Sequence, residues 1–269
     1  MNRLELRMVD ALIDLKENHH VIGVKAEFEA EGTRLEEALR LKEVSMKAGL
    51  GLTLKIGGAE ALRDMYECRV IGAERIVAPM VESAYALHKF LLASKLGFPE
   101  DEQEHVLLSI NVETVQSLQA FPEMLALPEI SELDGIVFGR VDFTGSMWKF
   151  REDVNGEKVL KMASDCFVQA KSKKLQCGIG GGVSAESLPF FRQLAPGHLD
   201  YYETRKVLFG CPGGLNSNAS AGILKAVGFE LLWLNNKRDY YSLIAKEDDE
   251  RIGMLERRYK SLIAAAGGK

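Results

Sequence analysis

Along this chain, short apolar runs alternate with longer stretches in which apolar residues recur at three- and four-residue spacing. The short runs predict buried strands and the amphipathic stretches predict helices, in the order typical of a parallel sheet wrapped by helices. Seven strands are expected, at residues 21–29, 50–57, 74–80, 105–113, 133–143, 175–182 and 198–209. Helices are expected at residues 2–17, 34–49, 59–72, 83–97 and 156–174.

The length of 269 residues fits one large barrel domain, because (β/α)8 barrels typically have about 250 residues. We therefore predict an α/β fold, a TIM-type (β/α)8 barrel spanning residues 1–269. An eighth strand is not evident, so either the barrel is modified, with the first strand as the expected place, or residues 204–209 continue into another strand.

Residues from about 219 to 269 are expected to form a helical extension with a polar break. A closed barrel leaves no core surface for so much amphipathic helix, so a homo-oligomer is expected.

Charge and cysteine content narrow the class of protein. The net charge is −5 and no basic stripe is present, which argues against a nucleic-acid partner. No apolar run approaches the ~20 residues that cross a bilayer, so no membrane partner and a cytoplasmic location are expected. The four cysteines have no CxxC spacing and are expected to be buried free thiols.

Several predicted strands become charged only towards their carboxyl ends, whereas a strand buried on both faces should stay apolar. Side chains alternate along a strand, so residues two apart share a face. The residues concerned are Lys25, Glu27 and Glu29; Lys55; Asn111 and Glu113; Arg140 and Asp142; and Glu203 and Arg205. Barrel enzymes build their active sites at this end, so these charges predict an active site. The alternative is a network of ion pairs that closes the barrel mouth, such as Lys25 with Glu27 or Arg205 with Glu203.

Glu113 and Asp142 are carboxylates at the ends of neighbouring predicted strands. One or two carboxylates, with water or substrate oxygens in the other positions, suit Mg²⁺, Mn²⁺ or another divalent metal. The same pair would suit acid and base in glycoside hydrolysis, but no aromatic sugar platform is evident.

Two further features concern anions and bases. The turn GIGGGVSAES at residues 178–187 joins a strand to a helix, so amides near Gly180 and Gly181 are candidates to bind a phosphate or carboxylate; a tight packing turn is the alternative. The five histidines precede strands or lie within a helix, and none is expected to act as a general base.

The segments LKIGGAEALRDMYECRVIGAERIVAPMVES, INVET and GIVFGRVDFTGS resemble the HpcH/HpaI aldolase and citrate lyase family, over roughly residues 22–182. In that family a glutamate and an aspartate at two strand ends hold the metal, which implies this role for Glu113 and Asp142. The resemblance places Lys55 where an arginine usually contacts pyruvate oxygens, so the charge is kept but the bidentate fork is lost. Main-chain amides near Gly139 would bind the substrate carboxylate.

The implied activity is that of a metal-dependent carbon–carbon lyase, or the reverse synthase, acting through the enolate of pyruvate or a related 2-oxo acid, with an unidentified second substrate. Two departures from the family pattern are the phenylalanine at position 28, where many members have a histidine base, and ETRK at residues 203–206. Glu27 or Glu29 could replace the base if burial raised its pKa. We predict catalytic roles for Lys55, Glu27, Glu29 and Arg205, and substrate-binding roles for Lys25, Asn111, Gly139, Arg140, Gly180, Gly181 and Glu203.

Two other functions remain open on the sequence. Lys55 or Lys25 could form a Schiff base, although neighbouring carboxylates would hold either amine protonated. Alternatively, the scaffold could serve as a non-catalytic binding or regulatory protein.

Overall fold

The computed structural model describes residues 1–149, 151–194 and 196–266, and the side chains of residues 151 and 152 are outside the description. Within these residues the strands form a closed barrel in sequence order. The strands are β1 (Val21–Glu27), β2 (Gly51–Lys55), β3 (Arg75–Ala78), β4 (Leu107–Val112), β5 (Gly135–Gly139), β6 (Gln176–Gly180), β7 (Tyr201–Glu203) and β8 (Val207–Gly210).

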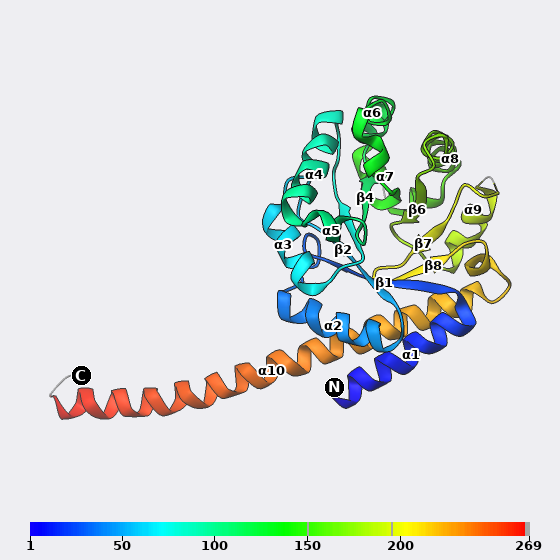
Figure 1. Cartoon of the computed structure of the whole chain (residues 1–269). Coiled ribbons are helices and arrows are strands. Elements are labelled where there is room, and N and C mark those ends of the chain that lie inside the picture. Colours follow the sequence, from blue (N-terminus) through cyan, green and yellow to red (C-terminus); the bar gives the residue numbers. More distant parts are fainter. Residues whose placement is uncertain (150, 195, 267–269) are drawn as a thin grey trace.

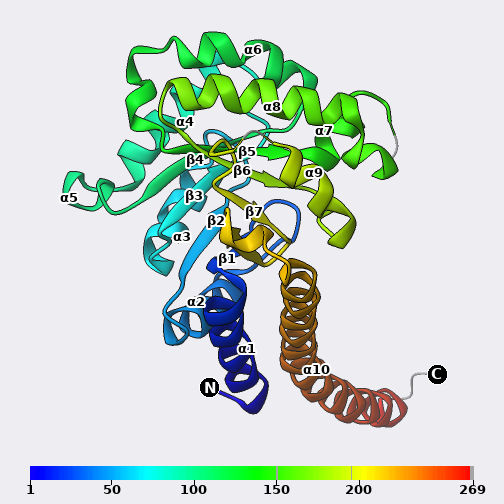
Figure 2. The same ribbon diagram turned by 90° about the vertical axis from the view of Figure 1, so that its right-hand side faces the viewer.

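Helices surround the barrel and cover its outer face (Figures 1 and 2). They are α1 (Arg3–His19), α2 (Leu35–Lys47), α3 (Leu62–Ile71), α4 (Ala84–Gly97), α5 (Glu100–Gln103), α6 (Val115–Leu125), α7 (Arg140–Ser146), α8 (Glu157–Ser172), α9 (Leu188–Gln193) and α10 (Ala219–Ala265). Short 3-10 helices lie at Pro128–Glu132, Arg151–Asn155, Ala185–Ser187 and Gly213–Leu215. The structure thus confirms the predicted TIM-type barrel with additional C-terminal helix.

The last strand departs from the ideal (β/α)8 pattern. Strands β1 to β7 pair in parallel, but β8 is antiparallel to both β7 and β1. The chain reverses after β7 in a tight turn, in which the Thr204 amide donates to the Val207 carbonyl oxygen over 3.0 Å. The strand predicted at residues 198–209 is therefore two strands, which confirms the alternative that residues 204–209 continue into another strand. The modification of the barrel lies at this last strand rather than at its first.

Other expected boundaries also change. Strand β5 ends at Gly139, and Arg140 begins helix α7, so Arg140 and Asp142 do not share a strand face. Strand β1 ends at Glu27, which leaves Glu29 in the following loop. The polar stretch in the C-terminal extension does not break it, because α10 is continuous over 47 residues. Polar residues lack the backbone defect of proline, so they permit a helix to continue through solvent.

The main apolar core lies between the strands and the helices rather than inside the barrel. Outward residues such as Leu54, Ile110 and Phe138 are fully buried against helices. Inside the barrel the described apolar cluster is small, and consists of Val77, Val137, Tyr201 and Leu208. TIM barrels usually fill this space with branched apolar side chains. Polar and charged residues must therefore occupy much of this interior.

Helix α1 packs on the outer side of the barrel beside the first part of α10, and Figure 1 shows the two helices side by side. Helix α1 begins with a capping box between Asn2 and Glu5. The amide group of Asn2 also donates to Asn236 over 2.6 Å, and Lys225 bonds to Asp14. The rest of α10 extends away from the barrel. None of the helices in the described part of the chain has both the length and the apolar character that a membrane crossing needs.

The cysteines are free thiols, as expected. Cys68, Cys166 and Cys177 are buried, whereas Cys211 is only half-buried.

A glycine in the barrel interior provides a test of this packing. A Cβ atom at Gly178 would lie 2.3 Å from the Tyr201 ring, so we expect Gly178→Ala to destabilise the fold by about 1–3 kcal/mol through overpacking. Urea unfolding measures the change. Gly228→Ala is the control, because nothing lies within 4 Å of its Cβ position and the helical backbone favours alanine. A Gly178→Ala protein as stable as the wild type would contradict this account.

Candidate active site at the carboxyl end of the barrel

Lys25 is the centre of a buried ion-pair group at the carboxyl end of β1. Its Nζ atom lies 3.0 Å from Glu27 Oε1 and donates a hydrogen bond to Glu203 Oε1. Burial opposes the charged amine, but the carboxylates of Glu203 and Glu27 raise the pKa of Lys25 well above its ordinary value. The pair of Lys25 with Glu27 that the ion-pair alternative named is thus present, and Lys25 carries its charge at neutral pH.

Glu113 lies at the end of β4, where its side chain is almost completely buried. Its Oε1 atom accepts a hydrogen bond of 2.9 Å from the Met80 amide, and its Oε2 atom accepts one of 2.7 Å from Asn111 Nδ2. Lys55 Nζ lies 3.6 Å from Glu113 Oε2 and 3.2 Å from Glu29 Oε2. The ends of β2 and β4 therefore bring Lys55, Asn111 and Glu113 together, as the alternation of side chains along these strands predicts.

Met80 is a contributor that sequence reasoning missed. It follows β3 with φ of 50°, a left-handed conformation that is unusual for a residue with a side chain. This conformation accompanies the donation of its amide proton to Glu113. Such backbone outliers cluster at functional sites, although no residue pattern in the sequence signals a positive φ at a methionine.

Gly139, at the end of β5, leaves the space that Glu113 occupies. A Cβ atom at this position would lie 2.7 Å from Glu113 Cβ and 2.8 Å from its Oε2. Gly180 stands in a similar relation to Glu203, with a hypothetical Cβ 3.0 Å from Glu203 Oε1. The absence of a side chain at Gly139 and at Gly180 therefore permits two buried carboxylates to lie across the mouth of the barrel.

Asp142 lies in the first turn of α7 and is exposed to solvent. Its negative charge contributes to the raised pKa of Glu113, although burial of Glu113 is the larger cause. The two carboxylates are therefore within electrostatic reach of each other. They share the rim of the barrel even though Asp142 belongs to a helix rather than to the expected strand.

Arg140 is fully buried and serves the loops around the site. Its guanidinium donates to the Gly180 carbonyl oxygen over 3.1 Å, to that of Gly181 over 2.8 Å, and to Asn155 Oδ1 over 2.6 Å. The ring of Phe191 lies 4.8 Å from the guanidinium carbon. Most of the donors that the predicted substrate-binding role requires are thus occupied by protein, and the side chain fastens the turn after β6 to the start of α7.

Gly180 and Gly181 are the first residues of the turn predicted to bind an anion. Gly181 has φ of 82°, and a Cβ there would lie 2.6 Å from the Val141 amide nitrogen, so the turn is tight and closely packed. The following helical segments, Ala185–Ser187 and Leu188–Gln193, are short. The packing alternative therefore accounts for these glycines, and anion binding at this turn stays a prediction.

Arg205 is the residue whose surroundings differ most from expectation. It lies in the turn between β7 and β8, half-exposed, 3.8 Å from Glu31 Oε1 and 3.7 Å from Glu230 Oε1. The expected pair with Glu203 is wrong because the turn directs the two side chains apart. The neighbouring Lys206 is buried and pairs with Glu31, a contact that sequence reasoning missed. These pairs join the turn to the loop after β1.

The histidines lie outside this site. His88 pairs with Glu129 on the outer helices over 2.6 Å, and His19 is buried at the end of α1. No histidine among the described residues forms a hydrogen bond or ion pair with Lys25, Lys55 or Glu113.

The site contains more negative than positive charge. Two lysines, Lys25 and Lys55, face the four carboxylates of Glu27, Glu29, Glu113 and Glu203. Two buried acceptor atoms, Asn111 Oδ1 and Glu203 Oε2, have no hydrogen-bond partner. Buried charges and acceptors are costly when unpaired, so the arrangement favours an additional cation or donor.

A divalent metal fits these residues on chemical grounds. No group of three or more metal-binding side chains is present in the part of the chain that the structure describes. Mg²⁺ commonly uses only one or two carboxylates and completes its coordination with water and substrate oxygens. Glu113 and Asp142 are the residues that would hold such an ion.

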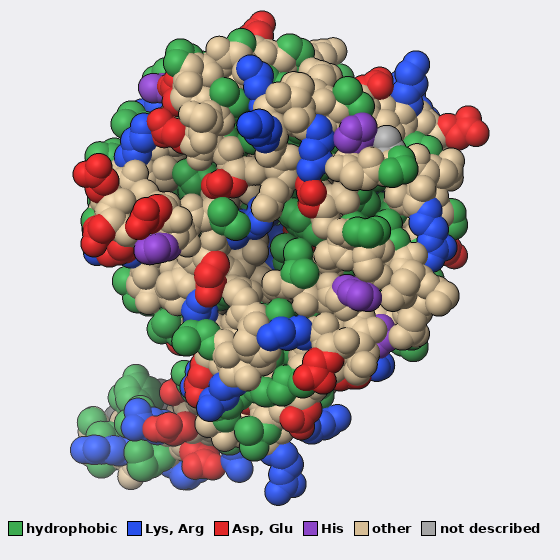
Figure 3. Space-filling view, turned by 45° about the vertical axis from the view of Figure 1, so that its right-hand side comes forward, with side chains coloured by type: hydrophobic (Ala, Val, Ile, Leu, Met, Phe, Trp, Pro, Cys, Tyr) green, Lys and Arg blue, Asp and Glu red, His purple; other side chains and the backbone are tan. Residues whose placement is uncertain are grey.

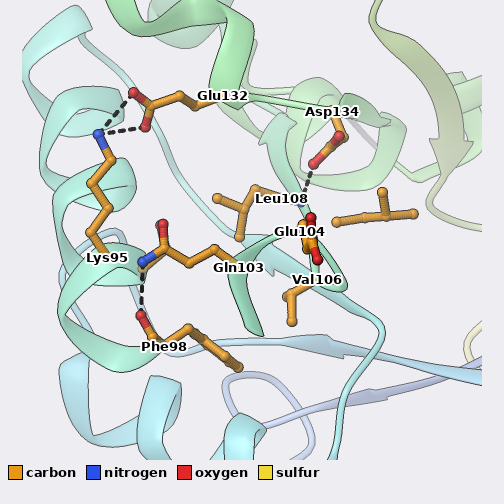
Figure 4. A pocket seen from close by; sticks show the side chains of 10 residues that line it. Lys95, Phe98, Gln103, Glu104, Val106, Leu108, Glu132 and Asp134 are labelled. Atoms are coloured by element: carbon orange, nitrogen blue, oxygen red, sulfur yellow. Dashed lines mark hydrogen bonds and ion pairs between the residues drawn. The ribbon is translucent and has the colours of Figure 1, made fainter. Parts of the chain in front are cut away.

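A surface pocket elsewhere on the barrel is not part of this site. Figure 4 shows its lining residues, among them Lys95 and Glu132, which form an ion pair, and Asp134, which accepts from the Leu108 amide over 2.7 Å. It lies at the amino ends of β4 and β5, whereas the charged cluster lies at their carboxyl ends.

Comparisons with known proteins identify relatives of the fold. No protein-family profile and no curated protein matches the sequence. A solved HpcH/HpaI aldolase from Desulfitobacterium hafniense DCB-2 is 15% identical, with a TM-score of 0.57, over 69% of this chain and 78% of the other. An HpcH/HpaI aldolase/citrate lyase family protein from Burkholderia cenocepacia J2315 is 14% identical, with a TM-score of 0.55, over 72% and 89%. The citrate synthase SbnG is 14% identical, with a TM-score of 0.58, over 86% and 90%. These likenesses agree with the resemblance in the sequence motifs and establish the fold.

The Lys25 group predicts a pH-dependent stability change. In Lys25→Met, Glu27 and Glu203 become buried carboxylates without their cation, so we expect a loss of about 3–5 kcal/mol at pH 7.5. In the wild type, burial tends to raise the pKa of Glu27, but Lys25 outweighs this effect and the pKa is lowered. A lowered carboxyl pKa stabilises the folded protein above the pKa of the same group in the unfolded chain, and this stabilisation is lost as the pH falls. In the variant the pKa of Glu27 should rise instead, because burial then acts without Lys25, so protonation towards pH 5 should narrow the difference in unfolding free energy between variant and wild type.

Urea unfolding of both proteins at pH 7.5 and pH 5 measures this. Lys225→Met is the control, because its pair with Asp14 is partly exposed and should cost under about 1 kcal/mol with little pH dependence. An equal loss at both pH values in Lys25→Met would show that packing, rather than the ion pairs, is responsible.

Proposed function

We propose that this chain is a carbon–carbon lyase, or the reverse synthase, that depends on a divalent metal such as Mg²⁺ or Mn²⁺ and acts through the enolate of pyruvate or a related 2-oxo acid. The observation that supports the proposal most is the buried carboxylate of Glu113, 3.6 Å from Lys55 and within electrostatic reach of Asp142, in a site with excess negative charge. The motifs NVET and GRVDF, in which these carboxylates occur, support it through the family resemblance.

A lyase of this kind breaks the bond between C3 and C4 of a 4-hydroxy-2-oxo acid. The electron pair passes into the enolate, a base takes the hydroxyl proton, and C4 leaves as an aldehyde carbonyl. The metal supplies Lewis acidity that stabilises the charge developing on the substrate oxygens. Glu113 and Asp142 would hold it, with Asn111 fixing the orientation of Glu113 through the bond to Oε2.

Lys55 is suited to neutralise developing negative charge. Burial disfavours its ammonium, but Glu113 outweighs this effect, and the pKa of Lys55 is raised above its ordinary value. A protonated Lys55 can donate a hydrogen bond to an enolate oxygen without moving away from Glu113. The buried ion pair of Lys25 with Glu203 lies beside Lys55.

Of the two glutamates that the sequence offered as the base, one is less suited. Burial tends to raise the pKa of Glu27, but the neighbouring Lys25 lowers it overall, so the condition set for Glu27 as a base is not met. Glu29, in the loop after β1 and 3.2 Å from Lys55, is the remaining candidate. Arg205 and the turn around it form the rim over which a second substrate, still unidentified, would enter.

A Schiff-base mechanism is less well supported. An amine must be unprotonated to attack a carbonyl, whereas the pKa values of Lys25 and Lys55 are both raised by neighbouring carboxylates. A non-catalytic binding role would rest on the lack of a histidine among the described residues of the site.

The decisive measurement is the exchange of pyruvate methyl protons in D₂O, followed by NMR, because it detects enolate formation without knowledge of the second substrate. We expect exchange with Mg²⁺ or Mn²⁺, loss of exchange with EDTA, and a decrease of about 100-fold or more in Glu113→Gln and in Asp142→Asn. Glu186→Gln, at an exposed position, is the control. Urea unfolding verifies that Glu113→Gln remains folded.

The outcomes separate the alternatives. Exchange that survives EDTA and gives a borohydride-trapped adduct on Lys25 or Lys55 would replace the metal mechanism with a Schiff base. No exchange with any divalent metal, and metal binding that Glu113→Gln abolishes while the protein's cellular function survives, would favour a non-catalytic role.

A further inference from the structure

The outer face of α10 carries a largely exposed apolar stripe, of which Tyr241 is the member that contacts the barrel domain, through its hydroxyl bond to Glu37 in α2. The helix buries Gly222, Ile223, Ala226, Phe229 and Trp233 against the barrel side. On the opposite face, residues at alternating three- and four-residue spacing form what we call the α10 stripe. Its members are Leu224, Val227, Leu231, Leu234, Arg238, Tyr241, Ala245, Asp248, Ile252, Leu255, Tyr259, Leu262 and Ala266.

This spacing is a heptad repeat that keeps one register through the whole helix. Alternate steps of three and four residues correspond to positions a and d of a coiled coil. Most of the large apolar side chains in the stripe are exposed, with Leu224 at 72% and Leu262 at 59%. Helix α10 has 47 residues, or about 70 Å of length, and Figure 1 shows its second part extending away from the barrel. The projecting part at the lower left of Figure 3 shows hydrophobic side chains among charged ones.

The two charged members of the stripe define the partner. Arg238 and Asp248 lie at equal distances along the sequence from Leu243. In an antiparallel pair of α10 helices centred on residue 243, each Arg238 would face the partner's Asp248. In a parallel pair, Arg238 would face its own copy and so would Asp248, which places like charges together.

The apolar members obey the same symmetry. Reversal about residue 243 pairs Leu224 with Leu262, Val227 with Tyr259, Leu231 with Leu255, Leu234 with Ile252, and Tyr241 with Ala245. Every layer then joins an a position to a d position, and only the Arg238 and Asp248 layers are polar. A shift by one heptad would instead place Arg238 against Tyr241 or Leu255. Charge and apolar pattern therefore select one orientation and one register.

We propose that two copies of this chain associate through an antiparallel coiled coil of their α10 helices, centred on Leu243, with reciprocal ion pairs between Arg238 and Asp248. The barrels pack on the other face of each helix, so the second part of one α10 can cover the first part of its partner. This association is independent of the chemistry in the barrel.

Sedimentation velocity of the full chain at micromolar concentrations tests the pairing. We expect a dimer for the wild type, dimerisation weakened by more than about tenfold in Asp248→Arg, and recovery in the charge-swapped double variant Arg238→Asp with Asp248→Arg. Glu250→Arg is the matched control, since it makes the same charge change on the opposite side of the helix. Circular dichroism verifies that each variant keeps its helix content.

Disulfide trapping tests the orientation. We expect Leu231→Cys and Leu255→Cys chains to cross-link when mixed, but neither to cross-link when alone. A monomeric wild type, or a dimer that Asp248→Arg leaves intact, would overturn the proposal. Cross-linking within each single variant would show a parallel pair and overturn it as well.

Discussion

The interior of this barrel is governed by the need to neutralise charge away from water. Lys25 and Lys55 lie among glutamates at the carboxyl ends of β1, β2, β4 and β7, where burial makes an unpaired ion costly. A barrel filled with branched apolar residues has no such requirement. The same cost explains why the strands are apolar on their outer faces, which supply the core, and carry their charges on the inner face. The lysines and glutamates of the site lie at the carboxyl end, whereas Arg75 lies inside the amino end, where it donates to Ser109 and Gln176.

The buried charges also determine how the space inside the barrel is filled. Glu113, Tyr201 and Glu203 are large side chains that lie across the interior, and the neighbouring strands β5 and β6 carry glycines at the positions where a Cβ atom would clash with them. Arg140 holds the neighbouring loops from outside by donating to carbonyl oxygens after β6. The glycines inside the barrel and the buried guanidinium of Arg140 therefore both support the site. Neither needs to contact a substrate to do so.

The sequence predicted what periodicity controls. Residues two apart in a strand share a face, so Lys25 with Glu27 and Asn111 with Glu113 were placed correctly by alternation alone. The prediction failed where the chain leaves regular structure. Arg140 and Asp142 separate because a helix begins at Arg140, and Arg205 turns from Glu203 because a hairpin reverses the chain. The left-handed backbone of Met80 and the pair of Lys206 with Glu31 depend on contacts distant in the sequence, which periodicity does not report.

This site differs from one with a histidine base in the kind of group that could take up a proton near neutral pH. A histidine titrates near neutral pH without help, whereas a carboxylate does so only if its surroundings raise its pKa. Here the lysine beside Glu27 acts in the opposite direction, and the carboxyl with a raised pKa is Glu113, the residue best placed for a metal. A cation beside Glu113 would itself favour the ionised carboxylate. The electrostatics of the cluster are thus better suited to binding a cation and stabilising an oxyanion than to strong general-base catalysis. The substrate that suits this barrel mouth best is therefore one whose reacting bond is acidic or readily cleaved.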